Sequence, residues 1–153
     1  MPTPEERLEQ LGVTLPAPAA PVAAYVPCVR TGDLVYVSGQ VPLVDGKPSH
    51  LGRLGAEVGL EDGVAAARTC AVNVLAALKA ELGALARVRR VVKVTVSVAS
   101  EPGFTDQPKV ANGASELLGE VFGEAGRHAR AAVGVAALPL GVPVEVDAIV
   151  EAG

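Results

Sequence analysis

The chain has 153 residues, of which half are hydrophobic and 3% aromatic, and its formal net charge is −4. A length within about 100–200 residues predicts one domain, and its core is expected to be built from Ala, Val and Leu. The acidic balance argues against a nucleic-acid-binding protein, because such proteins gather Lys and Arg to neutralise phosphates.

The sequence also argues against secretion, a membrane span and a metal site. The first residues, Met1 to Arg7, are polar and acidic, unlike a signal peptide, and no unbroken apolar run reaches the roughly 18 residues of a transmembrane helix. Cys28 and Cys70 are too few and too far apart for a disulfide framework or a zinc site. His50 and His128 lack the spacing of metal ligands. We therefore expect a cytoplasmic protein without a metal or a membrane partner.

Residues 1–21 are expected to form an N-terminal extension of a domain that spans residues 22–153. Thr3 is followed three residues later by Glu6, the spacing of a capping box, which predicts a short helix over residues 2–11. The proline-rich run at residues 15–21 cannot continue a helix. We expect the extension to lie on the surface of the domain.

Residues 23–29 and 33–38 are predicted to form a β-hairpin, because the turn residues Arg30-Thr31-Gly32-Asp33 separate them. Ser38-Gly39-Gln40 ends the second strand. A glycine there either marks a plain strand end or lets a ligand approach the backbone closely. Tyr25, one of two tyrosines, either fills the core or shapes a site.

Apolar side chains recur at three- and four-residue steps over residues 61–82 and 107–122, which predicts two amphipathic helices. Asn112 is mildly unfavourable in the second helix and hints at a hydrogen-bonding role. Between the helices, residues 91–99 alternate apolar and polar side chains and are predicted to form a half-buried strand. Its buried face is expected to hold Val92, Val94, Val96 and Val98.

Residues 129–138 and 143–150 are predicted to be the last two strands. The order of elements indicates an α+β fold, in which a mixed sheet of five or six strands carries both helices on one face. The other face is semi-polar and rich in small residues. Such a face suggests an interface with further copies of the chain, and hence an oligomer.

Arg130 leads an otherwise apolar strand, and a buried guanidinium is costly unless it is paired. Its planar fork matches a carboxylate, so either a protein carboxylate or a small carboxylate ligand is its expected partner. Glu145 is the second candidate, and a solvated or interface glutamate is the alternative. If the last two strands form a simple hairpin, Arg130 and Glu145 lie near its opposite ends and can share a site only between subunits.

Two blocks of sequence resemble a known family. Tyr25-Val26-Pro27, with the run from Gly32 to Pro42, is similar to the opening hairpin of the RidA (YjgF-like) reactive intermediate deaminases. The run from Arg130 to Pro139, with Val144-Glu145-Val146-Asp147-Ala148, is similar to the closing signature of that family. The elements between them follow the family order, and the resemblance covers roughly residues 22–151.

The resemblance implies a chorismate-mutase-like fold assembled as a homotrimer, with clefts between adjacent subunits. It implies hydrolysis of 2-imino acids, formed from 2-enamino acids, to 2-keto acids and ammonia without a cofactor. Arg130 would hold the substrate carboxylate, and Glu145 would activate the water and relay protons. The substrate-binding residues would be Tyr25, Ser38, Gly39, Asn112 and Ala132.

One position departs from the family. Many of its deaminases carry a cysteine or a hydroxyl residue two places after the arginine, where this chain has Ala132, which offers only its backbone N–H. Two alternatives therefore accompany the deaminase hypothesis. One is a non-catalytic trimer that binds small keto or amino acids as a sensor or chaperone-like partner. The other is an endoribonuclease, which the net charge and the scarcity of aromatic residues disfavour.

Overall fold

Five strands form one mixed sheet in the computed structural model, which describes residues 1–18 and 24–153. Their order is β1-β2-β7-β5-β6, and the pair β5–β6 is parallel while the others are antiparallel. The strands are β1 (Cys28–Thr31), β2 (Leu34–Gln40), β5 (Val88–Ala99), β6 (Ala129–Val135) and β7 (Val144–Ala152). Two short strands, β3 (Leu43–Val44) and β4 (Lys47–Pro48), pair separately. The predicted α+β class with a mixed sheet is confirmed.

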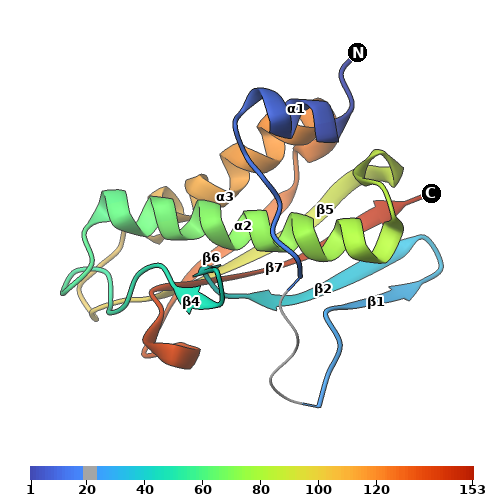
Figure 1. Ribbon diagram of the computed structural model, residues 1–153. Coiled ribbons are helices and arrows are strands. Elements are labelled where there is room, and N and C mark those ends of the chain that lie inside the picture. Colours follow the sequence, from blue (N-terminus) through green and yellow to red (C-terminus); the bar gives the residue numbers. More distant parts are fainter. Residues whose placement is uncertain (19–23) are drawn as a thin grey trace.

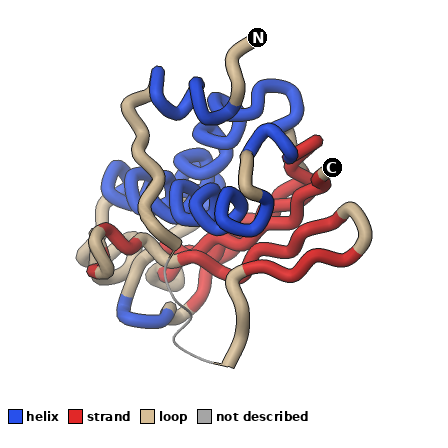
Figure 2. The backbone as a smooth tube through the Cα atoms, turned by 45° about the vertical axis from the view of Figure 1, so that its right-hand side comes forward, coloured by secondary structure: helices blue, strands red, loops and turns tan. Residues whose placement is uncertain are grey.

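The two long helices, α2 (Leu60–Leu82) and α3 (Gln107–Phe122), lie side by side on one face of the sheet (Figures 1 and 2). Both end at a glycine with positive φ, Gly83 at 84° and Gly123 at 62°, a common way to end a helix. A Cβ at Gly113 would overlap the carbonyl oxygen of Val64, so this glycine lets the helices approach closely. Both predicted helices and their place on one face are confirmed.

The core between the layers consists of small and branched apolar side chains, as the composition predicts. The sheet contributes Val35, Val37, Val94, Val96, Val98, Val144, Val146, Ala148 and Val150. By length and composition α2 could cross a membrane, but 56% of its most apolar window is buried. Its apolar face is that of a core helix packed on a sheet.

A bulge in β5 changes which valines are buried. The register between β5 and β7 shifts between Val91 and Lys93, so Val91 is 1% exposed whereas Val92 is 37% exposed. The prediction that Val92 shares the buried face with Val94 was wrong. A bulge inserts one residue and so moves the preceding side chains to the other face, which a simple alternation cannot anticipate.

The last two strands do not form a hairpin. β5 lies between β6 and β7, and β6 ends at Val135, before the 3₁₀ turn η3 at Pro139–Gly141. The strand predicted to run to residue 138 is therefore shorter. A parallel partner for β5 requires a crossover connection, and α3 supplies it by carrying the chain from the end of β5 back to the start of β6.

The N-terminal helix α1 (Pro4–Gln10) confirms the helix predicted near the start of the chain. Thr3 and Glu6 form the predicted capping box, with hydrogen bonds of 3.1 and 3.2 Å. Glu5 Oε2 accepts hydrogen bonds from Leu85 N at 2.8 Å and Lys79 Nζ at 3.3 Å. These contacts hold α1 on the side of α2 and α3 that faces away from the sheet (Figure 1).

The junction between the extension and the domain lies outside the described part of the chain. The predicted boundary at residues 21 and 22, the end of the connector at 15–21 and the first residue of the strand at 23–29 fall on residues 19–23. Beyond them, residues 24–27 are not a strand, because Pro27 lacks the N–H that a longer ladder needs. The hairpin itself is confirmed.

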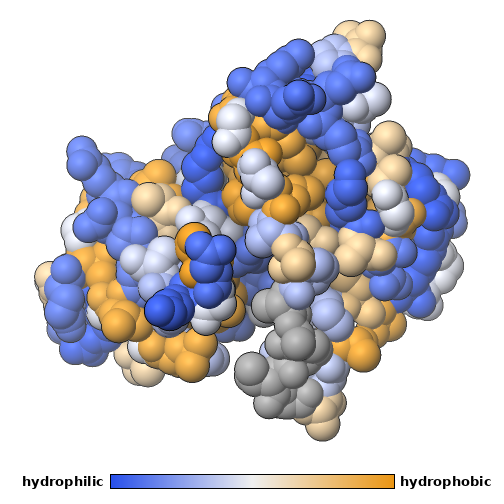
Figure 3. Space-filling model, viewed as in Figure 1, coloured by the Kyte–Doolittle hydropathy of each residue, from blue (hydrophilic) through white to orange (hydrophobic). Residues whose placement is uncertain are grey.

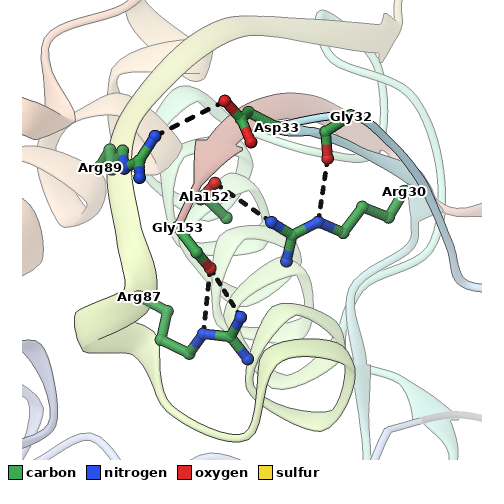
Figure 4. A network of polar contacts seen from close by, with 7 residues as sticks. All are labelled: Arg30, Gly32, Asp33, Arg87, Arg89, Ala152 and Gly153. Atoms are coloured by element: carbon green, nitrogen blue, oxygen red, sulfur yellow. Dashed lines mark hydrogen bonds and ion pairs between the residues drawn. The ribbon is translucent and has the colours of Figure 1, made fainter.

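Arginines hold together the sheet end at which the β1–β2 turn lies (Figure 4). Arg30 donates to the carbonyl oxygens of Gly32 at 3.1 Å and Ala152 at 3.3 Å. Arg87 donates twice to the Gly153 carbonyl oxygen, at 3.1 and 2.7 Å, and Arg89 lies 3.6 Å from the Asp33 carboxylate. Two of the three arginines between residues 87 and 90 are thus engaged in contacts within the fold.

Candidate functional site

Arg130 lies on β6 and points toward α3. It pairs with Val94 across the parallel ladder, and neighbouring residues of a sheet point to the same face, so its side chain lies on the helix-covered side. On α3, residues 108, 112 and 115 recur at steps of four and three and therefore share one helix face. That face meets the guanidinium.

Three neutral oxygens hold the guanidinium of Arg130. Its Nη1 donates to Asn112 Oδ1 at 2.8 Å and to Ser115 Oγ at 3.1 Å, and its Nη2 donates to the Pro108 carbonyl oxygen at 3.3 Å. Among residues 1–18 and 24–153, no carboxylate forms an ion pair with Arg130. The sequence left two partners open for this arginine, a protein carboxylate or a small carboxylate ligand. The structure does not show the first of these within the described residues.

The pattern of donors leaves one edge of the guanidinium open. The group carries five N–H donors, and three are engaged by the contacts above. The Nε–H and one Nη2–H have no acceptor in the described part of the chain. Nε and Nη2 form one edge of the guanidinium plane, and such an edge can bind a carboxylate through two parallel hydrogen bonds.

Asn112 and Ala132, which are predicted to bind substrate, lie beside this arginine. The side-chain oxygen of Asn112 accepts a hydrogen bond from Arg130, which leaves its amide nitrogen for other contacts. Ala132 shares the helix-covered face, two residues along β6, and packs against the core. Further along that face, a Cβ at Gly134 would lie 2.8 Å from Gln107 Nε2. The strand surface beside the guanidinium is thus lined by small residues.

Glu145 lies on the opposite face of the sheet. It pairs with Ser97, whose side is not covered by helices. A Cβ on Gly39 would overlap Glu145 Oε1 and would lie 2.9 Å from its Cδ. The register of β2 against β7 shifts between Val37 and Gln40, and this irregularity contains Gly39. The glycine is therefore needed to make room for the carboxylate, a reason that the sequence motif does not reveal.

The surroundings of Glu145 favour its protonated form. Burial raises the pKa of its carboxyl above the ordinary 4.5, and the neighbouring Asp147 carboxylate raises it further. Burial also raises the pKa of Asp147, whereas Lys93 lowers it. A carboxyl with a raised pKa holds its proton more readily than an ordinary glutamate, which suits it to both take up and release a proton.

Ser38 lies in β2, and Tyr25 lies in the segment that precedes β1. Ser38 Oγ donates to the Val26 carbonyl oxygen at 2.6 Å, and Ser38 N donates to that of Pro27 at 2.8 Å. The hydroxyl hydrogen of Ser38 is thus used within the chain, and its oxygen can still accept. Tyr25 is 50% exposed, so it does not fill the core.

The seven predicted site residues fall into two groups that one chain does not bring together. The arginine half-site consists of Asn112, Arg130 and Ala132, and the glutamate half-site consists of Tyr25, Ser38, Gly39 and Glu145. Arg130 and Glu145 lie on opposite faces of the sheet, and β5 separates β6 from β7. The predicted hairpin of the last two strands is absent. Even so, Arg130 and Glu145 of one chain still lie too far apart to share a site, as that prediction also implied.

Two contacting residues were missed by the sequence analysis. Ser115 binds Arg130, and His128, which was set aside because it lacks metal-ligand spacing, lies 2.9 Å from Ser115 Oγ through its Nε2. The available signal was the three-residue step from Asn112 to Ser115, which places both on one helix face. Within the described ranges, no group of three His, Cys, Asp or Glu side chains is arranged to hold a metal ion.

Two surface cavities differ in whether they contain predicted site residues. A cavity of about 300 Å³ lies next to Arg130 and is lined by Ser115, Gly119, Gly126, Arg127, His128 and Arg130. A larger one, about 680 Å³, lies between α1, residues 12–18 and α2, where Figure 3 shows apolar surface. The larger cavity contains none of the predicted site residues.

Comparison with known proteins assigns the family. A family model described as "YjgF/chorismate mutase-like, putative endoribonuclease" matches residues 5–151. The Trypanosoma cruzi protein TCP17 is 54% identical over 145 residues, which cover 94% of this chain and 91% of TCP17. The chain belongs to the YjgF/chorismate mutase-like family. The resemblance to RidA (YjgF-like) proteins and the predicted chorismate-mutase-like fold are confirmed.

Solved structures agree with this assignment. The Agrobacterium tumefaciens protein Atu1372, described as having unknown function, is 50% identical with a TM-score of 0.93, over 99% of this chain and 94% of its own. Escherichia coli TdcF, solved with bound serine, is 27% identical with a TM-score of 0.61, over 92% of this chain and 96% of its own. The match with Atu1372 extends over nearly the whole chain, the N-terminal helix included.

Replacing Gly39 tests the arrangement of the glutamate half-site. We expect Gly39→Ala to displace the Glu145 carboxylate, because the new methyl group would occupy its position. Gly59, where an added Cβ would meet nothing within 4 Å, provides the control Gly59→Ala. Crystal structures of both variants check the prediction, and an unmoved Glu145 in Gly39→Ala would contradict it.

Proposed function

We propose that the protein hydrolyses small 2-imino acids, formed from 2-enamino acids, to 2-keto acids and ammonia in clefts between the subunits of a homotrimer. The observation that carries the proposal is the Nε–Nη2 edge of Arg130, where each atom has an N–H without an acceptor among residues 1–18 and 24–153. A 2-imino acid carries its carboxylate next to the C=N carbon. A two-point hold on that carboxylate would therefore fix the position of the reacting carbon.

Glu145 is the proposed proton carrier. Its carboxylate takes a proton from water while the water oxygen bonds to the imine carbon, and it passes this proton to the imine nitrogen as the C=N bond becomes single. The resulting carbinolamine then gives its hydroxyl proton to Glu145 as the C=O bond forms, and Glu145 protonates the departing nitrogen as the C–N bond breaks and ammonia leaves. The raised pKa of this carboxyl supports such a role, since it must both accept and donate a proton.

The homotrimer is proposed because the two half-sites lie on opposite faces of one chain. A second copy could place its glutamate half-site against the arginine half-site of its neighbour. The uncovered sheet face offers apolar side chains for such an interface, including the exposed Val29, Tyr36 and Val133. The family resemblance supports three copies, and the serine bound by TdcF is an amino acid whose carboxylate would suit the Arg130 edge.

Turnover separates this proposal from its alternatives. With 2-iminobutanoate generated in situ, we expect the wild-type protein to accelerate its decay, and Arg130→Ala to lower kcat/KM by at least about a hundredfold. Arg90→Ala, at an exposed position of β5, is the charge-matched control. Binding of 2-oxobutanoate without turnover would instead indicate a non-catalytic carboxylate-binding protein, and RNA cleavage lost in Arg130→Ala would support the endoribonuclease alternative.

The pH dependence of turnover tests the role of Glu145. Because the base must be ionised, kcat/KM should fall as the pH drops through the Glu145 pKa, with a midpoint above the ordinary 4.5. Asp147→Asn removes a negative charge that raises this pKa, so the midpoint should move to lower pH while the plateau stays. Glu145→Gln should abolish the activity. An acid limb that Asp147→Asn leaves in place, or moves to higher pH, would argue against this assignment.

A further inference from the structure

We propose that Ser115 and His128 are positioning residues, which set the orientation of the carboxylate-binding edge of Arg130 through a chain of hydrogen bonds that ends at the Gly126 carbonyl. The chain runs from Arg130 Nη1 to Ser115 Oγ at 3.1 Å, from Ser115 Oγ to His128 Nε2 at 2.9 Å, and from His128 Nδ1 to the Gly126 oxygen at 2.7 Å. The inference rests on the proposed carboxylate-binding role of Arg130.

With a neutral imidazole at His128, the chemistry of the two ends determines the direction of every hydrogen bond. A carbonyl oxygen only accepts, so Nδ1 of His128 carries a hydrogen. In the neutral imidazole Nε2 then has a lone pair, and the Ser115 hydroxyl donates to it. The lone pairs of Ser115 Oγ are left for Arg130 Nη1, which only donates. All three bonds therefore run from the guanidinium toward the Gly126 carbonyl without conflict.

The chain connects three elements around one side chain. Ser115 belongs to α3, His128 directly precedes β6, and Gly126 ends the 3₁₀ turn η2 (Gly123–Gly126). A Cβ at Gly126 would overlap the carbonyl oxygen of Leu118, so η2 is packed tightly against α3. The terminal carbonyl is thus held by the fold, and it fixes the imidazole, the hydroxyl and the inner edge of the guanidinium in turn.

This arrangement differs from that of a nucleophile and its base. A serine that donates to a histidine resembles an activated hydroxyl. Here, however, a backbone carbonyl and not a carboxylate orients the imidazole, and Arg130 occupies the oxygen that would have to attack. The pair also borders the cavity of about 300 Å³ beside Arg130. The location and the contacts of Ser115 and His128 are therefore those of residues that hold the guanidinium in place.

Paired variants can separate the hydrogen bonds from packing. Ser115→Ala and His128→Phe break the chain, whereas Ser115→Thr keeps the hydroxyl and His128→Gln keeps an acceptor near the Nε2 position. Ser49 and His50 form a second Ser–His pair, with Oγ 2.9 Å from Nδ1, away from the Arg130 contacts. Ser49→Ala and His50→Phe are therefore matched controls. The melting temperature of each variant shows whether it is folded.

The first measurement is the affinity for 2-oxobutanoate by calorimetry, together with KM and kcat for 2-iminobutanoate. Ser115→Ala and His128→Phe should raise Kd and KM by about tenfold, with a smaller change in kcat. Ser115→Thr, His128→Gln and both controls should stay within about twofold of the wild type. Unchanged Kd and KM in the chain-breaking variants would overturn the inference.

The second measurement does not depend on the proposed reaction. In nitrogen-15 NMR spectra, a held guanidinium should show separate Nη1 and Nη2 signals for Arg130 in the wild type. In Ser115→Ala and His128→Phe these signals should broaden and move together, because one of the contacts that slow rotation about the Nε–Cζ bond is lost or weakened. If the wild type neither binds nor hydrolyses these compounds, the proposed function fails. The NMR comparison still decides the positioning role, and identical Arg130 signals in all variants would refute it.

Discussion

The guanidinium of Arg130 is held against α3 by three neutral oxygens, and in the described part of the chain no carboxylate pairs with it. A partly buried cation without a counter-charge is unfavourable, so the neutral contacts serve to orient the group and leave its charge for a ligand. This constraint determines which residues must surround it. Asn112 and Ser115 provide uncharged acceptors. The small residues along β6 have no long side chains that would cover the guanidinium.

The topology of the sheet determines what else the site requires. Since β5 lies between β6 and β7, Arg130 and Glu145 are two strands apart and point to opposite faces. In the glutamate half-site, the irregularity of β2 and the absence of a side chain at Gly39 make room for the Glu145 carboxylate. Each half-site is therefore built independently, and the chemistry proposed for them depends on the assembly of subunits.

Local patterns in the sequence were sufficient to predict much of this fold. Periodicity located α2, α3 and β7, and the Thr3–Glu6 spacing located α1. The opening-hairpin block and the block around Arg130 and Glu145 together identified the family. The bulge at Val92 and the position of β5 between β6 and β7 depend on long-range pairing, which no local pattern encodes. The same limit explains why Ser115 and His128 were missed. Their role arises only when α3, η2 and β6 pack together.

Subunit complementation tests the central claim, a site made from Arg130 of one chain and Glu145 of another. Arg130→Ala and Glu145→Gln proteins should each be inactive on 2-iminobutanoate. After they are unfolded, mixed in equal amounts and refolded, about a quarter of the wild-type activity should return, because each site then has an even chance of drawing each intact residue. Mixed oligomers that form but stay inactive would contradict a site shared between subunits.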